Sequence, residues 1–229
     1  MQNLPTPEVY EEEFKYLQWG ILVKEVLEKI KEIPQEARVL DLLCGPGYLL
    51  GKIKAIRPDL QLTGVDMGRE YIEYAQKTYL GIDFQVDDAI TWNSKNTFDF
   101  ILVTGGVHHL PYVDQERFVE KVSKLLKHNG QAVIGDPYID DYSSEEERKI
   151  AAVKLGYEYL VATIRNGATN AVIKALIDVL SNDVFLVEYK NSIRKMKPVY
   201  EKYFKTVEMH KTWPKETTEY GDYYFVLKK

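Results

Sequence analysis

Residues 39–48 read Val-Leu-Asp-Leu-Leu-Cys-Gly-Pro-Gly-Tyr, and this stretch decides the fold class. The apolar run that ends at Leu43 predicts a buried strand, and the two glycines after it predict a turn. A helical pattern then runs from Tyr48 to Ile56. Glycines at such a strand-to-helix turn let the backbone approach a ligand closely, and the amino end of the helix favours negative ligand groups. We therefore expect a small-molecule site at this turn.

The chain around this turn alternates between short apolar runs and helical patterns. Such alternation predicts an α/β fold, doubly wound, in which helices cover both faces of a mostly parallel sheet. Ligands of these sheets bind beyond the carboxyl ends of the strands, where the strand order reverses. The predicted strands are 38–43, 60–65, 82–86, 98–103 and 131–134, and the predicted helices between them are 48–56, 69–79 and 114–128.

Helical segments also flank this alternating region. Residues 10–32 predict one amphipathic helix, and overlapping capping boxes at Ser143 and Ser144 predict a helix to Arg165, followed by another at 171–180. We expect the latter two to form a helical cap over a pocket; helices that merely complete the core are the alternative. The expected parts of a single domain, 1–229, are a helical lead-in at 1–36, a cofactor-binding core at 37–136, a helical cap insertion at 140–190, and a last helix with a C-terminal hairpin at 191–229.

Composition and charge exclude several classes of protein. The 229 residues are 45% hydrophobic and 28% charged, which is ordinary globular composition. A net charge of −5 argues against nucleic acid as a partner, because phosphate neutralisation dominates that binding. The single cysteine, Cys44, excludes an internal disulfide and a Cys-rich zinc site. The acidic amino-terminal segment lacks the layout of a signal peptide, and the longest uncharged stretch, 100–113, is too short for a membrane span. We expect a soluble, cytoplasmic protein with no membrane partner and leave its oligomeric state open.

Three ligand classes use a glycine turn of this kind: nucleoside triphosphates, dinucleotides and S-adenosylmethionine. A phosphate loop requires a first glycine where Pro46 stands and a Ser or Thr where Ile53 stands. Asp41 would repel a pyrophosphate, whereas it would attract an ammonium by up to about 4 kcal/mol at roughly 4 Å for an effective dielectric near 20. This favours S-adenosylmethionine. An NAD(P)-dependent oxidoreductase and a non-catalytic S-adenosylmethionine-binding module remain as alternatives.

Acidic residues follow three consecutive predicted strands. Asp41 ends the first, and Asp66 ends the second, about twenty residues past the turn, where a carboxylate accepts hydrogen bonds from ribose hydroxyls. Asp88 follows the third strand and could accept from an adenine amino group, while Ala89 offers its backbone N–H to the ring. Three acids in this order suit an adenosyl ligand that bears an ammonium.

On these residues the sequence resembles the class I S-adenosylmethionine-dependent methyltransferases of the small-molecule type. One departure is Leu43, which stands where the family has the first glycine of its turn. The resemblance implies a seven-stranded sheet with an antiparallel last strand. It also implies S-adenosyl-L-methionine as cofactor and methyl transfer to an O or N atom of a small molecule or short peptide. The matching stretches are 39–47, 64–67, 86–89, 98–103 and 130–134.

The resemblance further implies a role for each matching residue. Asp41 would stand near the methionine ammonium, and Gly45 and Gly47 would let the backbone pass close to the ligand. Val103 and Thr104 would border the methionyl arm. The whole implied cofactor-binding set, in which Met67 lies against the adenine, is Asp41, Leu43, Gly45, Gly47, Asp66, Met67, Asp88, Ala89, Val103 and Thr104.

The acceptor side is expected in the segment Gly-Gly-Val-His-His-Leu-Pro at 105–111, which resembles the His-His-Leu loop of small-molecule methyltransferases. Histidine titrates near neutrality and suits proton removal. We expect His108 and His109 to be the catalytic pair, as base or as acceptor-orienting group; a structural role of both in the loop is the alternative. No His/Asp cluster with metal-ligand spacing is evident, so no metal is expected.

Two further features of the sequence bear on the acceptor. Asp136-Pro137-Tyr138 is comparable to the acidic-Pro-Pro-Tyr box of amino-methylating DNA enzymes, but it follows the fifth predicted strand instead of the fourth, so we set it aside. Aromatic side chains could close over a sulfonium or a protonated amine by cation–π contact, with core packing as the alternative. These side chains are Tyr10, Tyr16, Trp19, Tyr157 and Tyr159.

Overall fold

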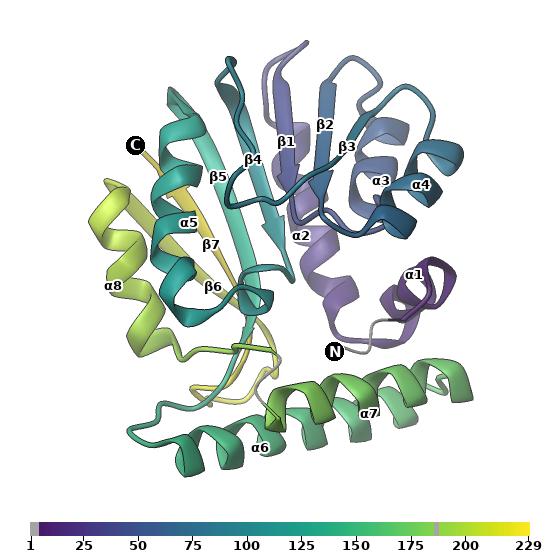
Figure 1. Ribbon diagram of the computed structural model, residues 1–229, viewed down its shortest axis with the longest axis vertical. Coiled ribbons are helices and arrows are strands. Elements are labelled where there is room, and N and C mark those ends of the chain that lie inside the picture. The colour runs from purple at the N-terminus through teal and green to yellow at the C-terminus, as the bar shows by residue number, and fades with distance from the viewer. Residues whose placement is uncertain (1–4, 186–187) are drawn as a thin grey trace.

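A computed structural model describes residues 5–185 and 188–229 of the chain. A seven-stranded sheet in the order β3-β2-β1-β4-β5-β7-β6 forms its centre (Figure 1). Strands β1 to β5 pair in parallel, and β7 is antiparallel to both of its neighbours, which confirms the predicted fold class. The strands are β1 Arg38–Leu42, β2 Gln61–Asp66, β3 Asp83–Val86, β4 Phe98–Thr104, β5 Leu126–Tyr138, β6 Thr206–Trp213 and β7 Gly221–Lys228.

Helices cover both faces of this sheet, so the central strands are apolar on both sides. Helices α2, α3 and α4 bury their apolar side chains against one face, and α5 and α8 pack on the other. Helices α6 and α7 lie beyond the carboxyl ends of the parallel strands (Figure 1). The helices are α1 Pro7–Tyr16, α2 Trp19–Lys31, α3 Tyr48–Ile56, α4 Arg69–Thr78, the 3₁₀ turn η1 Val107–His109, α5 Tyr112–Leu125, α6 Glu145–Arg165, α7 Asn170–Val184 and α8 Ile193–Tyr203.

The glycine turn between β1 and α3 is built from residues in the left-handed backbone region. Leu43 has a φ of 62°, and Gly47 has a φ of 82°. A Cβ on Gly47 would lie 2.7 Å from the ring of Phe84, so this position accepts only glycine without rearrangement. Leu43 adopts the same kind of backbone, and its side chain points to the loop after β4, where it contacts Gly106. The departure from the family pattern at Leu43 thus preserves the shape of the turn.

Two of the predicted helices differ from the structure. The single helix expected at 10–32 is wrong: α1 and α2 are separate, because Leu17 is extended and the chain turns so sharply that a Cβ on Gly20 would lie 2.6 Å from the carbonyl oxygen of Phe14. The helix expected at 114–128 begins earlier and ends at Leu125. Beyond it, Leu126 pairs with Phe98 and starts β5. Pairing between distant strands overrides the local helical pattern there.

The helical hairpin α6–α7 begins as its capping signals predict. The hydroxyl of Ser144 accepts the backbone N–H of Glu147, whose carboxylate in turn accepts the N–H of Ser143 at 2.6 Å. The hairpin turns at Gly167, with a φ of 77°. The terminal hairpin of β6 and β7 is also confirmed. Within the described residues, no helix combines the length and the apolar character that a membrane crossing requires.

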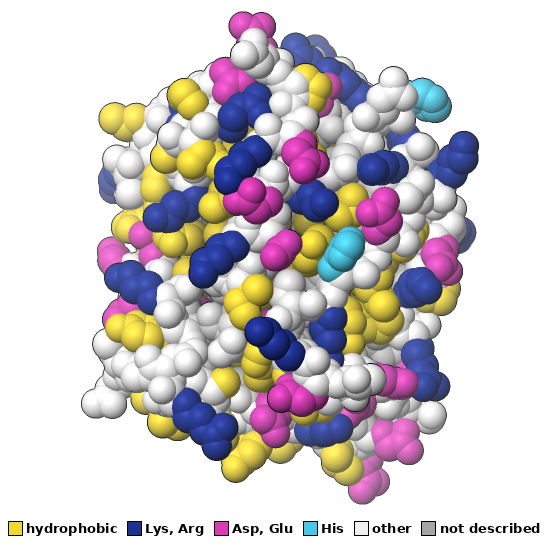
Figure 2. Space-filling view, turned by 180° about the vertical axis from the view of Figure 1, so that it is seen from behind, with side chains coloured by type: hydrophobic (Ala, Val, Ile, Leu, Met, Phe, Trp, Pro, Cys, Tyr) yellow, Lys and Arg dark blue, Asp and Glu magenta, His cyan; other side chains and the backbone are white. Residues whose placement is uncertain are grey.

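The surface carries charges of both signs. On the face seen in Figure 2, lysine and arginine side chains are interspersed with aspartate and glutamate, and apolar groups lie between them. Such a mixed face does not provide the basic stripe on which phosphate-backbone binding depends.

Candidate active site

The carboxyl ends of β1, β2 and β4 bring the predicted cofactor-binding residues to one edge of the sheet. Asp41 pairs in register with Gly64 of β2 and Leu102 of β4. The N–H of Leu43 donates to the carbonyl of Val65 at 2.8 Å, which ties the glycine turn to the end of β2. Thr104, the last residue of β4, lies at the same edge. Residues from three strands therefore surround one site.

Asp66 is held in place by the backbone of two loops. One carboxylate oxygen accepts the N–H of Gly45 at 2.9 Å, and the other accepts the N–H of Gly68 at 2.7 Å. Burial raises the pKa of Asp66, and these two hydrogen bonds oppose that shift. Each oxygen of a carboxylate can accept a second hydrogen bond. Asp66 is thus oriented for hydroxyl donors at the end of β2.

Asp41 is a buried acid whose hydrogen bonding is incomplete among the described residues. Its side chain is 1% exposed, and its Oδ1 finds no hydrogen-bond partner among the described residues. Burial, together with the nearby charge of Asp66, raises the pKa of Asp41 well above its usual range. An unpaired buried acceptor destabilises a protein by about 1–3 kcal/mol. A bound cation would relieve this cost, so Asp41 fits the ammonium of S-adenosylmethionine.

Helix α1 covers the glycine turn with aromatic side chains. A Cβ on Gly45 would lie 3.7 Å from the ring of Tyr10, and the ring of Phe14 stacks on that of Tyr48 with centroids 4.4 Å apart. Trp19 approaches the loop after β4, where a Cβ on Gly105 would lie 3.0 Å from its indole. The lead-in helices therefore form one wall of the site.

The remaining predicted cofactor contacts lie farther out or face inward. The carboxylate of Asp88 accepts the N–H of Ile90 at 2.7 Å, so it already caps its own loop. The side chains of Ala89 and Val103 are buried in the core, which leaves their backbone as the part that could face a ligand. Met67 is 71% exposed and lies at the surface, directly after the end of β2.

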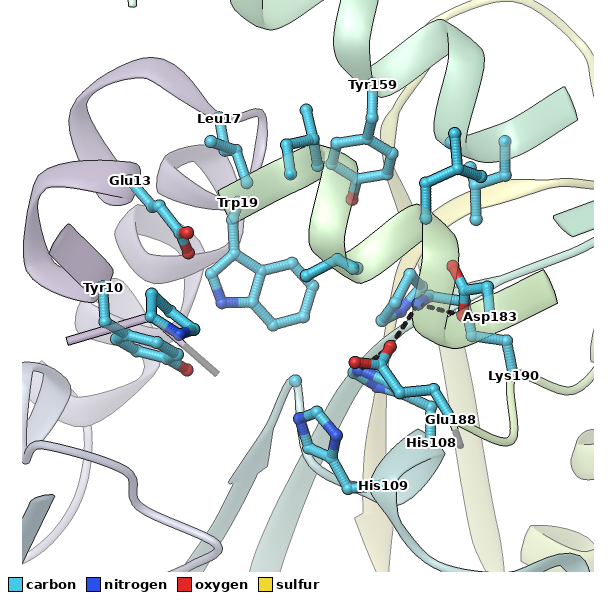
Figure 3. A pocket seen from close by; sticks show the side chains of 18 of the residues that line it. Tyr10, Glu13, Leu17, Trp19, His108, His109, Tyr159, Asp183, Glu188 and Lys190 are labelled. Atoms are coloured by element: carbon cyan, nitrogen blue, oxygen red, sulfur yellow. Dashed lines mark hydrogen bonds and ion pairs between the residues drawn. The ribbon is translucent and has the colours of Figure 1, made fainter. Parts of the chain in front are cut away.

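A pocket lies between the carboxyl edge of the sheet, helix α1 and the α6–α7 hairpin (Figure 3). His108 and His109 line its floor, and Tyr10, Trp19 and Tyr159 are among its aromatic walls. Most of the remaining lining is aliphatic, and much of it comes from the two inserted helices. These side chains are Leu17, Leu155, Leu176, Val179 and Leu180.

His108 is held between two carboxyl groups. Its Nδ1 lies 2.8 Å from Oδ1 of Asp136, and its Nε2 lies 3.7 Å from Oε2 of Glu188. The backbone N–H of His108 also donates to Asp136 at 3.0 Å. Burial lowers the pKa of His108 to about 4 and raises the pKa of Asp136 to about 8, because each charged form loses hydration. The geometry fixes the imidazole ring and turns its Nε2 toward Glu188.

A buried lysine joins this cluster from the segment after α7. The ammonium of Lys190 lies 2.7 Å from Asp183 and 2.9 Å from Glu188. Burial alone would raise the pKa of Glu188, but the positive charge of Lys190 and its hydrogen bond, together with His108 and His109, hold that pKa well below its usual range. Glu188 therefore presents a negative charge at the polar end of an otherwise apolar pocket.

His109, which is half-buried, completes the floor of the pocket. Burial lowers its pKa to about 4. Ligand atoms of His108, His109 and Glu188 lie within 4.8 Å of one another, a set that could hold a metal ion, although Lys190 already places a positive charge beside Glu188. That no metal is needed stays a prediction.

Comparison with known families identifies the core. Residues 39–130 match the family model described as a methyltransferase domain. The core of this chain is a class I methyltransferase domain. Strands β1 to β4 and the glycine turn with its acidic companions lie in or directly beside the matched residues, and β5 begins there.

Curated relatives share this methyltransferase domain. The chain is 33% identical over 112 residues to demethylmenaquinone methyltransferase of Thermotoga maritima, a match that covers 48% of each chain. It is 28% identical over 128 residues to trans-aconitate 2-methyltransferase of Methylobacterium radiotolerans, which covers 55% of this chain and 48% of the relative. The chain spans about half the length of the curated relatives it matches.

The fold is also similar to that of solved methyltransferases over nearly the whole chain. The plantazolicin methyltransferase in complex with S-adenosylhomocysteine and a desmethylPZN analogue superposes with a TM-score of 0.61 over 94% of this chain and 85% of that one. The sequence identity is 13%, so the likeness concerns the fold alone.

Several polar residues beside the methyltransferase domain were not predicted as part of the site. Asp136 was set aside on its strand position, yet it pairs with His108 across the ends of β4 and β5. Glu13, Asp183, Glu188 and Lys190 line the pocket from helices and a loop that only the tertiary fold brings there.

Proposed function

We propose that the protein is an S-adenosylmethionine-dependent methyltransferase that acts on an O or N atom of a small molecule or short peptide. The observation that carries this proposal is the buried Asp41 carboxylate, whose Oδ1 has no partner among the described residues and which lies one residue before the end of β1, next to the glycine turn. A methionine ammonium would supply the missing positive charge. A dinucleotide pyrophosphate would add a second negative charge beside it.

The cofactor would supply a methyl group on a sulfonium, which is already a good leaving group. Asp41 would bind the ammonium end, and Gly45 and Gly47 would allow close passage of the backbone. Asp66 would accept the ribose hydroxyls with the carboxylate oxygens that the backbone already orients. The contacts expected of Leu43, Met67, Asp88, Ala89, Val103 and Thr104 belong to the same proposal.

The protein's part in the reaction is alignment and exclusion of water. The apolar walls of the pocket exclude water, because helices α1, α6 and α7 cover the carboxyl edge of the sheet. His109 lines the floor and would orient the accepting atom, while His108, fixed by Asp136, would keep Glu188 and the loop in position. Both histidines thus serve the acceptor side of the site in this proposal.

The relatives do not fix the acceptor. One is named for demethylmenaquinone and the other for trans-aconitate, which are chemically unlike, and both matches cover about half of the relative. The residues that surround the acceptor pocket come largely from outside the matched region. The choice of acceptor therefore depends on the residues that line this chain's own pocket.

Calorimetric titration with S-adenosylhomocysteine tests the proposal. We expect micromolar binding by the wild-type protein and at least a tenfold loss in Asp66→Ala, with NADPH as the comparison ligand. The variant's circular dichroism spectrum must match that of the wild type. Binding of NADPH without binding of S-adenosylhomocysteine would replace the proposal with a nicotinamide-dependent function.

A further inference from the structure

A carboxylate on helix α1 faces the pocket without a partner among the described residues. Glu13 lines the pocket, and its side chain forms no hydrogen bond or ion pair with any described residue. Figure 3 shows it beside the rings of Tyr10 and Trp19, on the opposite side of the indole from Glu188. Burial, with a smaller contribution from the charge of Glu188, raises its pKa to about 8. An ammonium beside Glu13 would lower this pKa again, so the carboxylate forms when such a ligand binds.

Acidic groups outnumber basic ones around this pocket. Glu13, Asp183 and Glu188 line it, and Lys190 is the one lysine or arginine among its described lining residues. The ammonium of Lys190 is already engaged by Asp183 and Glu188, so it has little capacity left for a ligand anion. Such a pocket disfavours carboxylates and phenolates, because a like charge in a low-dielectric site is costly. It favours a ligand that carries a positive charge.

Aromatic faces accompany these carboxylates. The rings of Tyr10, Trp19 and Tyr159 line the same pocket. An ammonium over an aromatic face gains about 0.5–2 kcal/mol, with the larger values where water is excluded. A carboxylate beside two rings is therefore a suitable receptor for an ammonium. The aliphatic side chains of α6 and α7 suit an apolar body attached to it.

We propose that the methyl acceptor is an apolar amine that enters this pocket as its ammonium and is bound by Glu13. The proposal rests on the methyltransferase function proposed above and names its acceptor class. The body of the amine lies against Leu155, Leu176 and Leu180, and the ammonium lies beside Glu13 at the rings of Tyr10 and Trp19.

The proton and electron balance of this step is simple. The ammonium nitrogen gives one proton to the Glu13 carboxylate, which leaves a neutral amine with a free lone pair. That lone pair forms the new N–C bond while the bond from the methyl carbon to sulfur breaks, and the electron pair of the broken bond stays on sulfur. The product is a methylated ammonium and a neutral thioether. The proton on Glu13 passes to water when the pocket opens.

A matched set of three probes tests the acceptor class: 1-naphthylmethylamine, 1-naphthalenemethanol and 1-naphthoic acid. Each is titrated calorimetrically into the wild-type protein, with and without S-adenosylhomocysteine. We expect the amine to bind at least tenfold more tightly than the alcohol, and the acid to bind weakest. Glu13→Gln should weaken the amine at least tenfold and leave the alcohol unchanged. Glu8→Gln, an exposed position on the same helix, is the control and should bind like the wild type.

Several outcomes would overturn the proposal. Equal binding of the alcohol or the acid, or no binding of the amine to a protein that binds S-adenosylhomocysteine, would exclude an amine acceptor. If Glu13→Gln weakens S-adenosylmethionine or S-adenosylhomocysteine, Glu13 belongs to the cofactor site instead. Failure of the proposed function is distinguishable, because it shows as no binding of S-adenosylhomocysteine whatever the order of the three probes.

Discussion

Replacing Asp41 with asparagine should stabilise the protein and weaken its cofactor binding at the same time. The carboxylate is 1% exposed, and its Oδ1 lacks a partner among the described residues. Burying this carboxylate costs at least the roughly 1–3 kcal/mol of an unmet buried acceptor, and a neutral amide of the same shape removes the further cost of the buried charge. For a chain of this size, each kcal/mol shifts the melting temperature by about 2–4 °C. We therefore expect Asp41→Asn to melt several degrees above the wild type.

The effect on the cofactor should have the opposite sign. A hydrogen bond to a charged group contributes about 1.5–3 kcal/mol, so loss of the charge at Asp41 should weaken S-adenosylhomocysteine by roughly 10- to 150-fold. Because burial raises the pKa of Asp41, the wild-type protein loses stability as pH rises above about 4, the range where the unfolded carboxyl ionises. The stability advantage of Asp41→Asn should therefore be absent near pH 4 and present at pH 7.

Differential scanning calorimetry and isothermal titration with S-adenosylhomocysteine measure both effects. Asp99→Asn is the control, because Asp99 lies at the amino end of β4 and binds Lys127 and the N–H of Arg38, each within 2.9 Å. That variant should lose stability and keep its cofactor affinity. A lower melting temperature of Asp41→Asn with unchanged affinity would refute the reasoning.

Three further predictions concern stability. Leu43→Ala should be about 1 kcal/mol less stable than Leu43→Gly in urea unfolding, because alanine keeps the cost of a φ of 62° and glycine does not; equal stabilities would contradict this. Arg148→Met should lower the free energy of unfolding by about 1–3 kcal/mol, since the buried guanidinium donates to the carbonyl of Asp183 at 2.8 Å; circular dichroism melting tests it. Burial raises the pKa of Glu13 and Asp136 to about 8 and that of Asp222 to about 7, so the native state holds more protons than the unfolded chain and stability should fall between pH 6.5 and 8. The buried histidines make stability rise with pH, but only below their usual pKa of 6.5, so they do not affect this range. The Asp222→Asn variant should show a smaller fall in stability between about pH 6.5 and 8.

The sequence predicts the core well because its signals there are local. The helix at 48–56 begins and ends where predicted, since a glycine turn precedes it and a proline follows closely. Capping side chains set the start of α6 in the same way. The two errors at 10–32 and 114–128 arise where distant residues make contact, as Asn166 does with the carbonyl of Tyr16 and Leu126 with Phe98. Local patterns do not contain that information.

The residues of the candidate site also differ in whether local sequence patterns could locate them. Asp41, Asp66 and the glycine turn could be predicted because each sits at the end of a strand, and parallel strands end at one edge. The partners of His108 could not, since Asp136 lies 28 residues away and Glu188 comes from a loop beyond the inserted helices. Leu43 is intermediate: its place in the motif was evident, but its left-handed backbone was visible only in the structure.

The origin of the pocket walls has a consequence for how this protein could change over time. Among the described lining residues, only Gly105, His108 and His109 belong to the region shared with the methyltransferase family, and the others come from α1, α6, α7 and the segments next to them or from β5. Substitutions in those helices could alter the acceptor while the cofactor contacts proposed for Asp41 and Asp66 stay intact. Selection can therefore explore new acceptors on a constant methyl-donor site, and orthologues that share the core need not share a substrate.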